Sequence, residues 1–288
     1  MRSYLRLLRV SHWVKNLFLF LPVFFAGDLF HWETVARLIG GFFCFSLSSG
    51  AVYIFNDYMD IESDKLHNQK RNRPLAAGEI TPISALSLAG FSVVVSLGGA
   101  FAFDNQFVII LSIYLINNIL YSSKLKHIPI LDLTIIAIGF ILRIFAGGAL
   151  TETPISNWLV LMTFLLALFL GLSKRRDDVL IFRRDGDRVR RSIDGYNLDF
   201  INASMVMMSS VLIVSYIMYT VSEQVISRIG HDDLYLTVFF VVLGLLRYLQ
   251  ISLVHNDSGS PTKILLKDRF IQITIFGWIV AFYFLLYR

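Results

Sequence analysis

The sequence predicts an all-α, polytopic membrane protein with nine transmembrane helices. Hydrophobic residues make up 56% of the 288 residues and charged residues only 16%, whereas soluble domains are about a quarter charged. Apolar runs long enough to cross a bilayer recur along the whole chain, and Lys and Arg gather in alternate connections between them. One soluble core cannot absorb so much apolar surface, so the composition excludes a soluble enzyme, a disordered chain and a disulfide-rich secreted scaffold.

Nine runs have the length and composition of membrane spans. The first follows Arg2, Arg6 and Arg9, as in a signal peptide, but it has no A-x-A-like cleavage site and is interpreted as a retained span. The predicted spans are residues 14–30, 34–55, 83–103, 106–122, 128–150, 156–173, 200–222, 233–254 and 268–287. No connection between them is long enough to fold alone, so residues 1–288 are predicted to form a single transmembrane domain.

The positively charged residues predict how the chain is oriented in the membrane. Most of the 26 Lys and Arg residues lie at the N-terminus and in the connections near residues 56–82, 123–127, 174–199 and 255–267. Because Lys and Arg mark cytoplasmic loops, these segments are predicted to be cytoplasmic and, with nine spans, the C-terminus to be outside. The same loops account for the net charge of +5, so no nucleic-acid partner is expected.

The connection after the second predicted span begins with Asn56 and three aspartates. Asp57, Asp60 and Asp64 are spaced i, i+3 and i+7, which places them within about 60° of one another on a helix. Three carboxylates on one face repel one another unless a cation lies between them. Mg²⁺ prefers such oxygen ligands together with substrate phosphates. The pattern therefore favours a Mg²⁺ site; the alternative is a solvated loop whose acidic residues offset nearby lysines.

A basic strip follows these aspartates and contains Lys70, Arg71 and Arg73. A metal ion flanked by guanidinium groups is an arrangement that binds a diphosphate and neutralises it as it leaves. Pro74 and Gly78 interrupt the helix and can fold the strip back over the aspartates. The alternative is that the strip only marks the cytoplasmic side of the membrane.

These motifs resemble a known family. N-D-x-x-D-x-x-x-D at residues 56–64, followed by K-R-x-R-P-L-A-A-G at residues 70–78, is similar to the UbiA-type intramembrane prenyltransferase superfamily. Other segments resemble one branch of it, the polyprenyl-phosphate (decaprenyl-phosphate) phosphoribosyltransferases. Those segments are residues 11–27, 121–127, 132–148, 173–178 and 265–272. The resemblance covers nearly the whole chain and implies that the nine helices bundle around a central cavity open to lipid, whose polar mouth is capped by the cytoplasmic loops after spans two and six.

The chain departs from the family in one motif. Prenylating members carry a second aspartate motif, often D-x-x-x-D, after span six. Here Ile181 and Phe182 stand four residues after Asp177 and Asp178, so that motif is missing at the expected place. The departure weakens aromatic prenylation and favours the phosphoribosyl branch, in which phosphoribosyl pyrophosphate supplies the diphosphate.

The resemblance implies a Mg²⁺-dependent transferase of cell-envelope (cell-wall) polysaccharide precursor synthesis. It would move 5-phosphoribosyl from phosphoribosyl pyrophosphate to a polyprenyl phosphate lipid and release pyrophosphate. Asp57, Asp60 and Asp64 would hold the metal, Asp57 and Asp60 acting in catalysis through it, and the anionic acceptor would need no general base. Further candidates for binding the diphosphate and the substrates are Asn56, Lys70, Arg71, Arg73, Lys15, Lys124, Lys126, Lys174, Arg175, Arg176 and Asp177.

Two other functions stay open. An aromatic or quinone-precursor prenyltransferase shares the first aspartate motif. A membrane transporter predicts polar residues at mid-membrane in interrupted helices, whereas here they concentrate at the cytoplasmic ends. In every case we expect an integral protein of a bacterial or archaeal plasma membrane. The prenyl chain length, the oligomeric state and the number of metal ions are not predicted.

Two charged residues fall within one predicted span. Asp132 and Arg143 share a helix face but stand about 16 Å apart along the axis, too far to pair. Asp132 is expected to position Lys124 or Lys126. For Arg143, a hydrogen bond to backbone carbonyls and a contact with substrate are both open.

Overall fold

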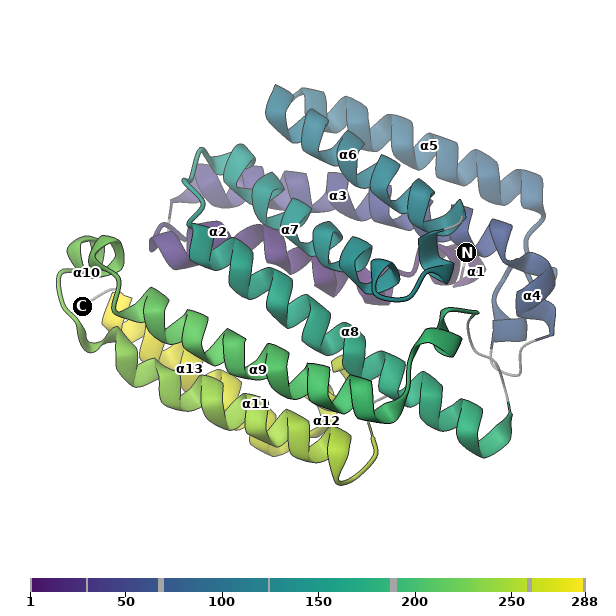
Figure 1. The fold of residues 1–288 in the computed structure, drawn as a ribbon. Helices are drawn as coiled ribbons and strands as arrows, with labels where there is room; N and C mark the ends of the chain where they lie inside the picture. Colours follow the sequence, from purple (N-terminus) through teal and green to yellow (C-terminus); the bar gives the residue numbers. More distant parts are fainter. Residues whose placement is uncertain are drawn as a thin grey trace. The chain divides into compact units, whose positions relative to one another are not determined.

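The computed structural model describes residues 2–29, 31–66, 70–123, 125–186, 191–257 and 261–286, and it has helices and no strand in these ranges (Figure 1). Eight of these helices are long and apolar enough to cross a membrane. The helices group into two compact units: residues 1–126 with 138–155, and residues 127–137 with 156–288. The predicted all-α class is confirmed.

The predicted count of nine spans is not confirmed. Residues 14–30 form a 3₁₀ segment, η1 (Val10–Phe20), and a short α-helix, α2 (Leu21–Ala26), instead of one long α-helix. Pro22 lies at the start of α2, where its missing N–H costs nothing, and Gly27 ends the helix at φ 82°. The other eight predicted spans each fall on a long apolar helix.

The first unit is built around the long helix α3 (Trp32–Met59), which packs along α5 (Pro82–Phe101) and α6 (Asn105–Ser123) (Figure 1). Small residues let α3 and α5 approach: the hydroxyls of Ser48 and Ser96 lie 2.9 Å apart, and Ser96 also donates to the Cys44 carbonyl at 2.6 Å. The unit also contains α1 (Arg2–Leu7), α4 (Ile61–Lys65), η2 (Lys70–Asn72) and most of α7 (Leu131–Thr151).

The second unit contains the start of α7 and the remaining long helices. α8 packs on α9, and α11 packs on α13. Side-chain caps begin two of them: Ser156 accepts from the Leu159 amide at 3.1 Å, and Asn197 from the Phe200 amide at 2.7 Å. Its elements are α8 (Asn157–Asp185), η4 (Arg191–Gly195), α9 (Leu198–Thr220), α10 (Glu223–Ile229), η5 (Asp233–Thr237), α11 (Val238–Leu253), α12 (Pro261–Lys267) and α13 (Arg269–Leu286). A short 3₁₀ turn, η3 (Leu125–His127), precedes α7.

Helix α8 is longer than predicted. Residues 174–185 were expected to lie in a loop, but the helix continues to Asp185 and ends at Gly186, whose φ of 72° suits a left-handed cap. Lys, Arg, Leu and Ile in this stretch are compatible with a helix, so high charge alone does not mark its end.

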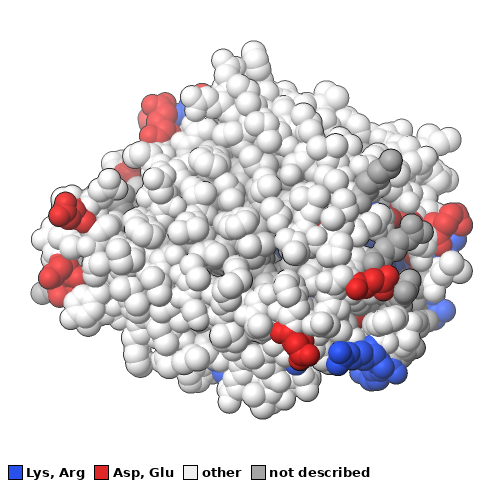
Figure 2. Space-filling view, in the orientation of Figure 1, with Lys and Arg blue, Asp and Glu red and all other residues white. Residues whose placement is uncertain are grey.

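The face in Figure 2 carries few charged side chains. Large apolar residues such as Phe91 and Phe276 are about two-thirds exposed (67% and 68%), as expected where lipid is the solvent.

Candidate active site

The aspartate motif lies across a helix break. Asn56 and Asp57 belong to the last turn of α3, which ends at Met59. Asp60 leaves the helical conformation, with φ −102° and ψ 6°, and leads into α4, which carries Asp64. The aspartates were predicted to lie on one face of a continuous helix, and the break at Asp60 contradicts this. Asp57 and Asp64 nevertheless approach the same partner.

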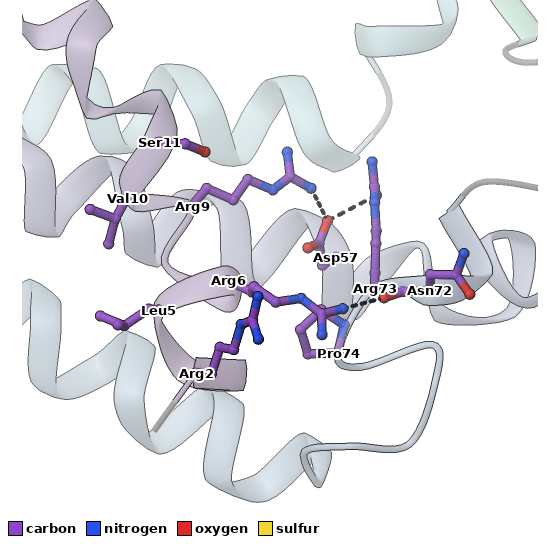
Figure 3. A pocket seen from close by; sticks show the side chains of 10 residues that line it. All are labelled: Arg2, Leu5, Arg6, Arg9, Val10, Ser11, Asp57, Asn72, Arg73 and Pro74. Carbon is purple, nitrogen blue, oxygen red and sulfur yellow. Dashed lines mark hydrogen bonds and ion pairs between the residues drawn. The ribbon is translucent and has the colours of Figure 1, made fainter.

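That partner is Arg73 of the basic strip. Its Nη1 donates to Asp57 Oδ1 at 2.9 Å and to Asp64 Oδ2 at 2.7 Å, so one nitrogen bridges two carboxylates that are each only 2% exposed. Arg9 makes a second ion pair with Asp57 (Figure 3). The two buried carboxylates therefore share two guanidinium groups, which offset their desolvation and mutual repulsion.

Asp60 has a different set of partners. Lys126 Nζ donates to Asp60 Oδ1 at 2.5 Å, and Asn56 Nδ2 donates to Oδ2 at 3.3 Å. The other polar atom of Asn56, Oδ1, is buried and has no hydrogen-bond partner among the described residues. A buried acceptor without a donor is costly, and a cation or a ligand donor beside it would remove that cost.

The side-chain oxygens of the aspartate motif suit a hard metal ion, although the carboxylates of Asp57, Asp60 and Asp64 are not gathered about one point. No group of three His, Cys, Asp or Glu side chains within the described ranges is arranged to hold a metal. In this structure the carboxylates instead meet Arg73, Arg9 and Lys126. The ligand types present are carboxylate and amide oxygens, which fit Mg²⁺, and one of those oxygens is unpaired.

The basic strip folds back as expected. Pro74 and Leu75 are buried, and Gly78 takes φ 72° as the chain turns, with the Ala77 amide donating to the Arg73 carbonyl at 2.8 Å. This turn brings Arg73 to the aspartates. Its neighbours differ, because Arg71 is exposed and Lys70 is half-buried.

The N-terminal arginines reach the same site, which the sequence did not predict. Arg9 has a left-handed backbone, with φ 50°, and its guanidinium lies over the Tyr53 ring at 4.7 Å as well as beside Asp57. A pocket of about 470 Å³ opens here. Arg2, Leu5, Arg6, Arg9, Val10, Ser11, Asp57, Asn72, Arg73 and Pro74 line it (Figure 3). In the sequence, the positive charge of Arg2, Arg6 and Arg9 indicates only the topology.

A second cationic group lies deeper in the first unit. Arg143 is 5% exposed and contacts no carboxylate among the described residues. Its Nε donates to Asn16 Oδ1 at 2.8 Å, its Nη1 to the Gly139 carbonyl at 2.7 Å and its Nη2 to the Tyr114 hydroxyl at 3.2 Å. The structure therefore favours the hydrogen-bonding role left open for Arg143. Lys15, half-buried on η1, lies near enough to interact with the charge of Arg143.

Asp132 does not position Lys126, contrary to the expectation. It is fully buried in the second unit and accepts from Arg175 Nε at 2.8 Å and from the Tyr196 hydroxyl at 2.7 Å. Lys126 instead binds Asp60, and Lys124 lies outside the described residues. The sign of the charges in the sequence could not predict which of the basic residues would pair with Asp132.

Helix α8 carries three consecutive basic residues, Lys174, Arg175 and Arg176, and each lies in a different environment. Arg175 is 1% exposed and pairs with Asp178 at 3.0 Å as well as with Asp132. Arg176 is 4% exposed and donates to Asn202 and Asn256, while its buried Nη1 has no hydrogen-bond partner in the described part of the chain. Lys174 is exposed and Asp177 is half-buried. Of the two buried arginines, Arg176 thus retains an unpaired N–H group that could donate to an anion.

Comparison with known proteins agrees with this fold and these motifs. Residues 17–260 match the sequence model of the UbiA prenyltransferase family. A decaprenyl-phosphate phosphoribosyltransferase from Mycolicibacterium smegmatis is 29% identical over 285 residues, covering 96% of this chain and 89% of that protein. The enzyme of the same name from Mycobacterium tuberculosis is 28% identical over 280 residues, covering 95% of this chain and 91% of its own.

The fold also matches solved structures. A UbiA homolog from Archaeoglobus fulgidus bound to GPP and Mg²⁺ superposes with a TM-score of 0.72 at 18% identity, covering 99% of this chain and 100% of that one. The match to the family model, together with the eight long apolar helices of the described residues, makes the chain an integral membrane protein. Since the family model covers most of its length, the chain belongs to the UbiA prenyltransferase family.

Proposed function

We propose that this protein transfers the 5-phosphoribosyl group of phosphoribosyl pyrophosphate to a polyprenyl phosphate and releases pyrophosphate. The observation that carries the proposal is the buried pair Asp57 and Asp64 joined through Arg73, next to the unpaired acceptor of Asn56. Such a site has both the oxygen ligands for a metal and the guanidinium groups for a diphosphate. The names of the relatives from M. smegmatis and M. tuberculosis, and the missing second D-x-x-x-D, favour phosphoribosyl over prenyl transfer.

The metal would bind to the aspartate motif. Asp57, Asp60 and Asp64 would be the carboxylate ligands, with Asn56 Oδ1 as a further donor. Mg²⁺ bound there would neutralise part of the diphosphate charge. Arg73 and Arg9 would then exchange carboxylate oxygens for phosphate oxygens, which are equally good partners for a guanidinium fork.

The reaction at the sugar follows from these contacts. The bond between C1 of the ribose and the pyrophosphate oxygen breaks with oxocarbenium character, and pyrophosphate leaves with the electron pair. A phosphate oxygen of the lipid forms the new bond to C1. Arg9, Arg73 and Lys126 donate to the departing pyrophosphate, which stabilises charge where it develops. The acceptor is anionic at neutral pH, so no general base is assigned.

The orientation of the site follows the positive charge. The N-terminal arginines and Arg73 of the basic strip line the pocket beside Asp57, and such clusters of positive charge lie on the cytoplasmic side. We infer that the pocket faces the cytoplasm, where a soluble phosphosugar is available, while the lipid acceptor arrives through the membrane.

The test uses purified protein in lipid nanodiscs, supplied with phosphoribosyl pyrophosphate labelled in the ribose, a polyprenyl phosphate and Mg²⁺. Labelled lipid is expected, and its formation should stop with a chelator and resume with added Mg²⁺. A parallel reaction contains geranyl diphosphate and 4-hydroxybenzoate. Prenylated product there, with no labelled lipid in the first reaction, would reject phosphoribosyl transfer in favour of aromatic prenylation.

A further inference from the structure

The pocket beside α1 has more cationic groups than the aspartates need. Four arginines line it: Arg2, Arg6, Arg9 and Arg73 (Figure 3). Its volume of about 470 Å³ falls within the range of roughly 300–1,000 Å³ that is typical of small-molecule sites. A site built only to hold Asp57 in place would need neither this volume nor all four side chains.

The charges around the pocket do not balance. Arg9 and Arg73 pair with Asp57, and Arg73 also pairs with Asp64. Arg6, whose side chain is 46% exposed, pairs with Glu79 at 3.1 Å. No hydrogen bond or ion pair joins Arg2 to another residue of the described ranges. One positive charge is therefore left over, and it faces a pocket already lined with N–H donors.

Arg6 is held in position before any ligand binds. Its Nη2 donates to the Asn72 carbonyl at 2.6 Å, while Nη1 lies 3.1 and 3.3 Å from the two Glu79 oxygens. Ser3 also donates to Glu79 at 2.7 Å, which fixes the carboxylate. A guanidinium held in this way loses less conformational entropy when it binds an anion than a free side chain would.

We propose that this pocket binds a phosphate monoester, recognised by Arg2 and Arg6, as a second phosphate subsite next to the aspartates; the proposal rests on the proposed function. A monoester carries close to two negative charges at neutral pH, and guanidinium groups match its oxygens in a bidentate way. Asp57 lines the pocket and belongs to the aspartate motif, so the two subsites adjoin. A prenyl diphosphate has no phosphate other than its diphosphate, whereas both substrates of the proposed reaction carry a monoester.

The monoester has two possible sources with the same chemistry. One is the 5-phosphate of the phosphoribosyl donor, and the other is the terminal phosphate of the polyprenyl acceptor. Ribose 5-phosphate and farnesyl phosphate are probes that separate them. Pyrophosphate with Mg²⁺ is the probe for the aspartate motif and should not depend on Arg2.

The experiment measures the dissociation constants of the three probes for the protein in nanodiscs. The variants are Arg2→Gln and the double variant Arg2→Gln/Arg6→Gln. Arg37→Gln is the matched control, because Arg37 is a partly exposed arginine that pairs with Glu152 and does not line the pocket. Arg2→Gln keeps the test valid if the double variant folds poorly, since the Arg2 side chain contacts no other described residue through a polar bond.

The expected result is a rise of about tenfold in the dissociation constant of at least one monoester on Arg2→Gln, the effect of losing one charge-assisted contact. A larger rise is expected in the double variant, with Mg²⁺-pyrophosphate binding within about twofold of wild type. A rise for ribose 5-phosphate identifies the donor's phosphate, and a rise for farnesyl phosphate identifies the acceptor's. Unchanged constants for both monoesters would overturn the proposal. These readouts need no turnover, so a protein that makes no ribosylated lipid would reject the proposed function without deciding the pocket.

Discussion

The contact between Asp57 and Arg73 predicts a measurable coupling energy. The two groups are 2.9 Å apart, Asp57 is 3% exposed and Arg73 is 26% exposed at the side chain, so the bond is short and mostly shielded from water. Hydrogen bonds to charged groups in such places contribute about 1.5–3 kcal/mol. Arg9 already neutralises part of the Asp57 charge, which places the expected coupling near the lower end, at about 2 kcal/mol.

A double-mutant cycle with Asp57→Asn and Arg73→Gln measures this coupling and removes the separate effects of each variant, including the loss of the Arg73 bond to Asp64. The assay is reversible unfolding in mixed detergent micelles, followed by circular dichroism. The matched control cycle is Glu62→Gln with Lys65→Gln. The distance from Lys65 Nζ to Glu62 Oε1 is similar, at 2.8 Å, but the side chain of Lys65 is 49% exposed and that of Glu62 is 85% exposed.

The control coupling is expected to be below about 0.5 kcal/mol, because exposed pairs three residues apart are weak. Equal couplings in the two cycles would refute the reasoning, since burial of Asp57 would then have no energetic consequence. A coupling near zero for Asp57 and Arg73 alone would mean that Arg9 fully replaces Arg73 as a partner.

Three further predictions follow from the contacts. Asp60→Asn should lower kcat/KM for labelled-lipid formation by roughly 10²–10³ by weakening a metal ligand, while Glu62→Gln, on the adjacent α4, should stay within about twofold; retained activity in Asp60→Asn would count against the metal site. Hydrogen bonds from Ser3 and then Arg6 lower the pKa of the Glu79 carboxyl, so its stabilising effect is present above the unfolded-state pKa and is lost as the pH falls through the folded-state pKa. The melting temperature of wild type should therefore exceed that of Glu79→Gln at pH 7, with the gap closing in acid; a gap that widens in acid would contradict this sign. Gly147→Ala should destabilise the protein by about 2 kcal/mol or more, because the new Cβ would lie 2.0 Å from the Leu19 carbonyl oxygen, whereas Gly90→Ala meets nothing within 4 Å and should be neutral or stabilising by up to about 1 kcal/mol; equal melting temperatures for the two variants would show that the backbone yields at Gly147.

Much of the candidate site could be predicted from local sequence. Asp57 and Asp64 stand at the end of an apolar run, and their spacing indicated that they would face a common partner. Pro74 and Gly78 predicted the turn that returns Arg73 to them, which the structure contains. The turn prediction worked because it depends on residues within about 20 positions, where turn preferences act directly, whereas the spacing of the aspartates assumed one continuous helix that in fact breaks at Asp60.

Other parts of the site depend on contacts between distant segments. Arg9 reaches Asp57 across 48 positions, and Lys126 reaches Asp60 across 66. The periodicity of the sequence carries no information about such pairs. By charge alone, every basic residue near the aspartates was an equally good candidate for their partner. The packing of α3 against its neighbours selects which of them arrive, and it leaves Arg71 in solvent.

The sequence by itself determined that this protein is a helical membrane protein with an acidic motif and a basic strip after its second apolar run. Apolar length, charge position and local spacing suffice for that, because the bilayer allows few other solutions. Only the tertiary structure decided that the first apolar run is partly 3₁₀, that Asp60 breaks the helix, and that Asp132 pairs with Arg175 instead of a nearby lysine. The last outcome depends on which charged group lies at hydrogen-bond distance from Asp132, and that is set by how whole helices pack rather than by any short stretch of residues.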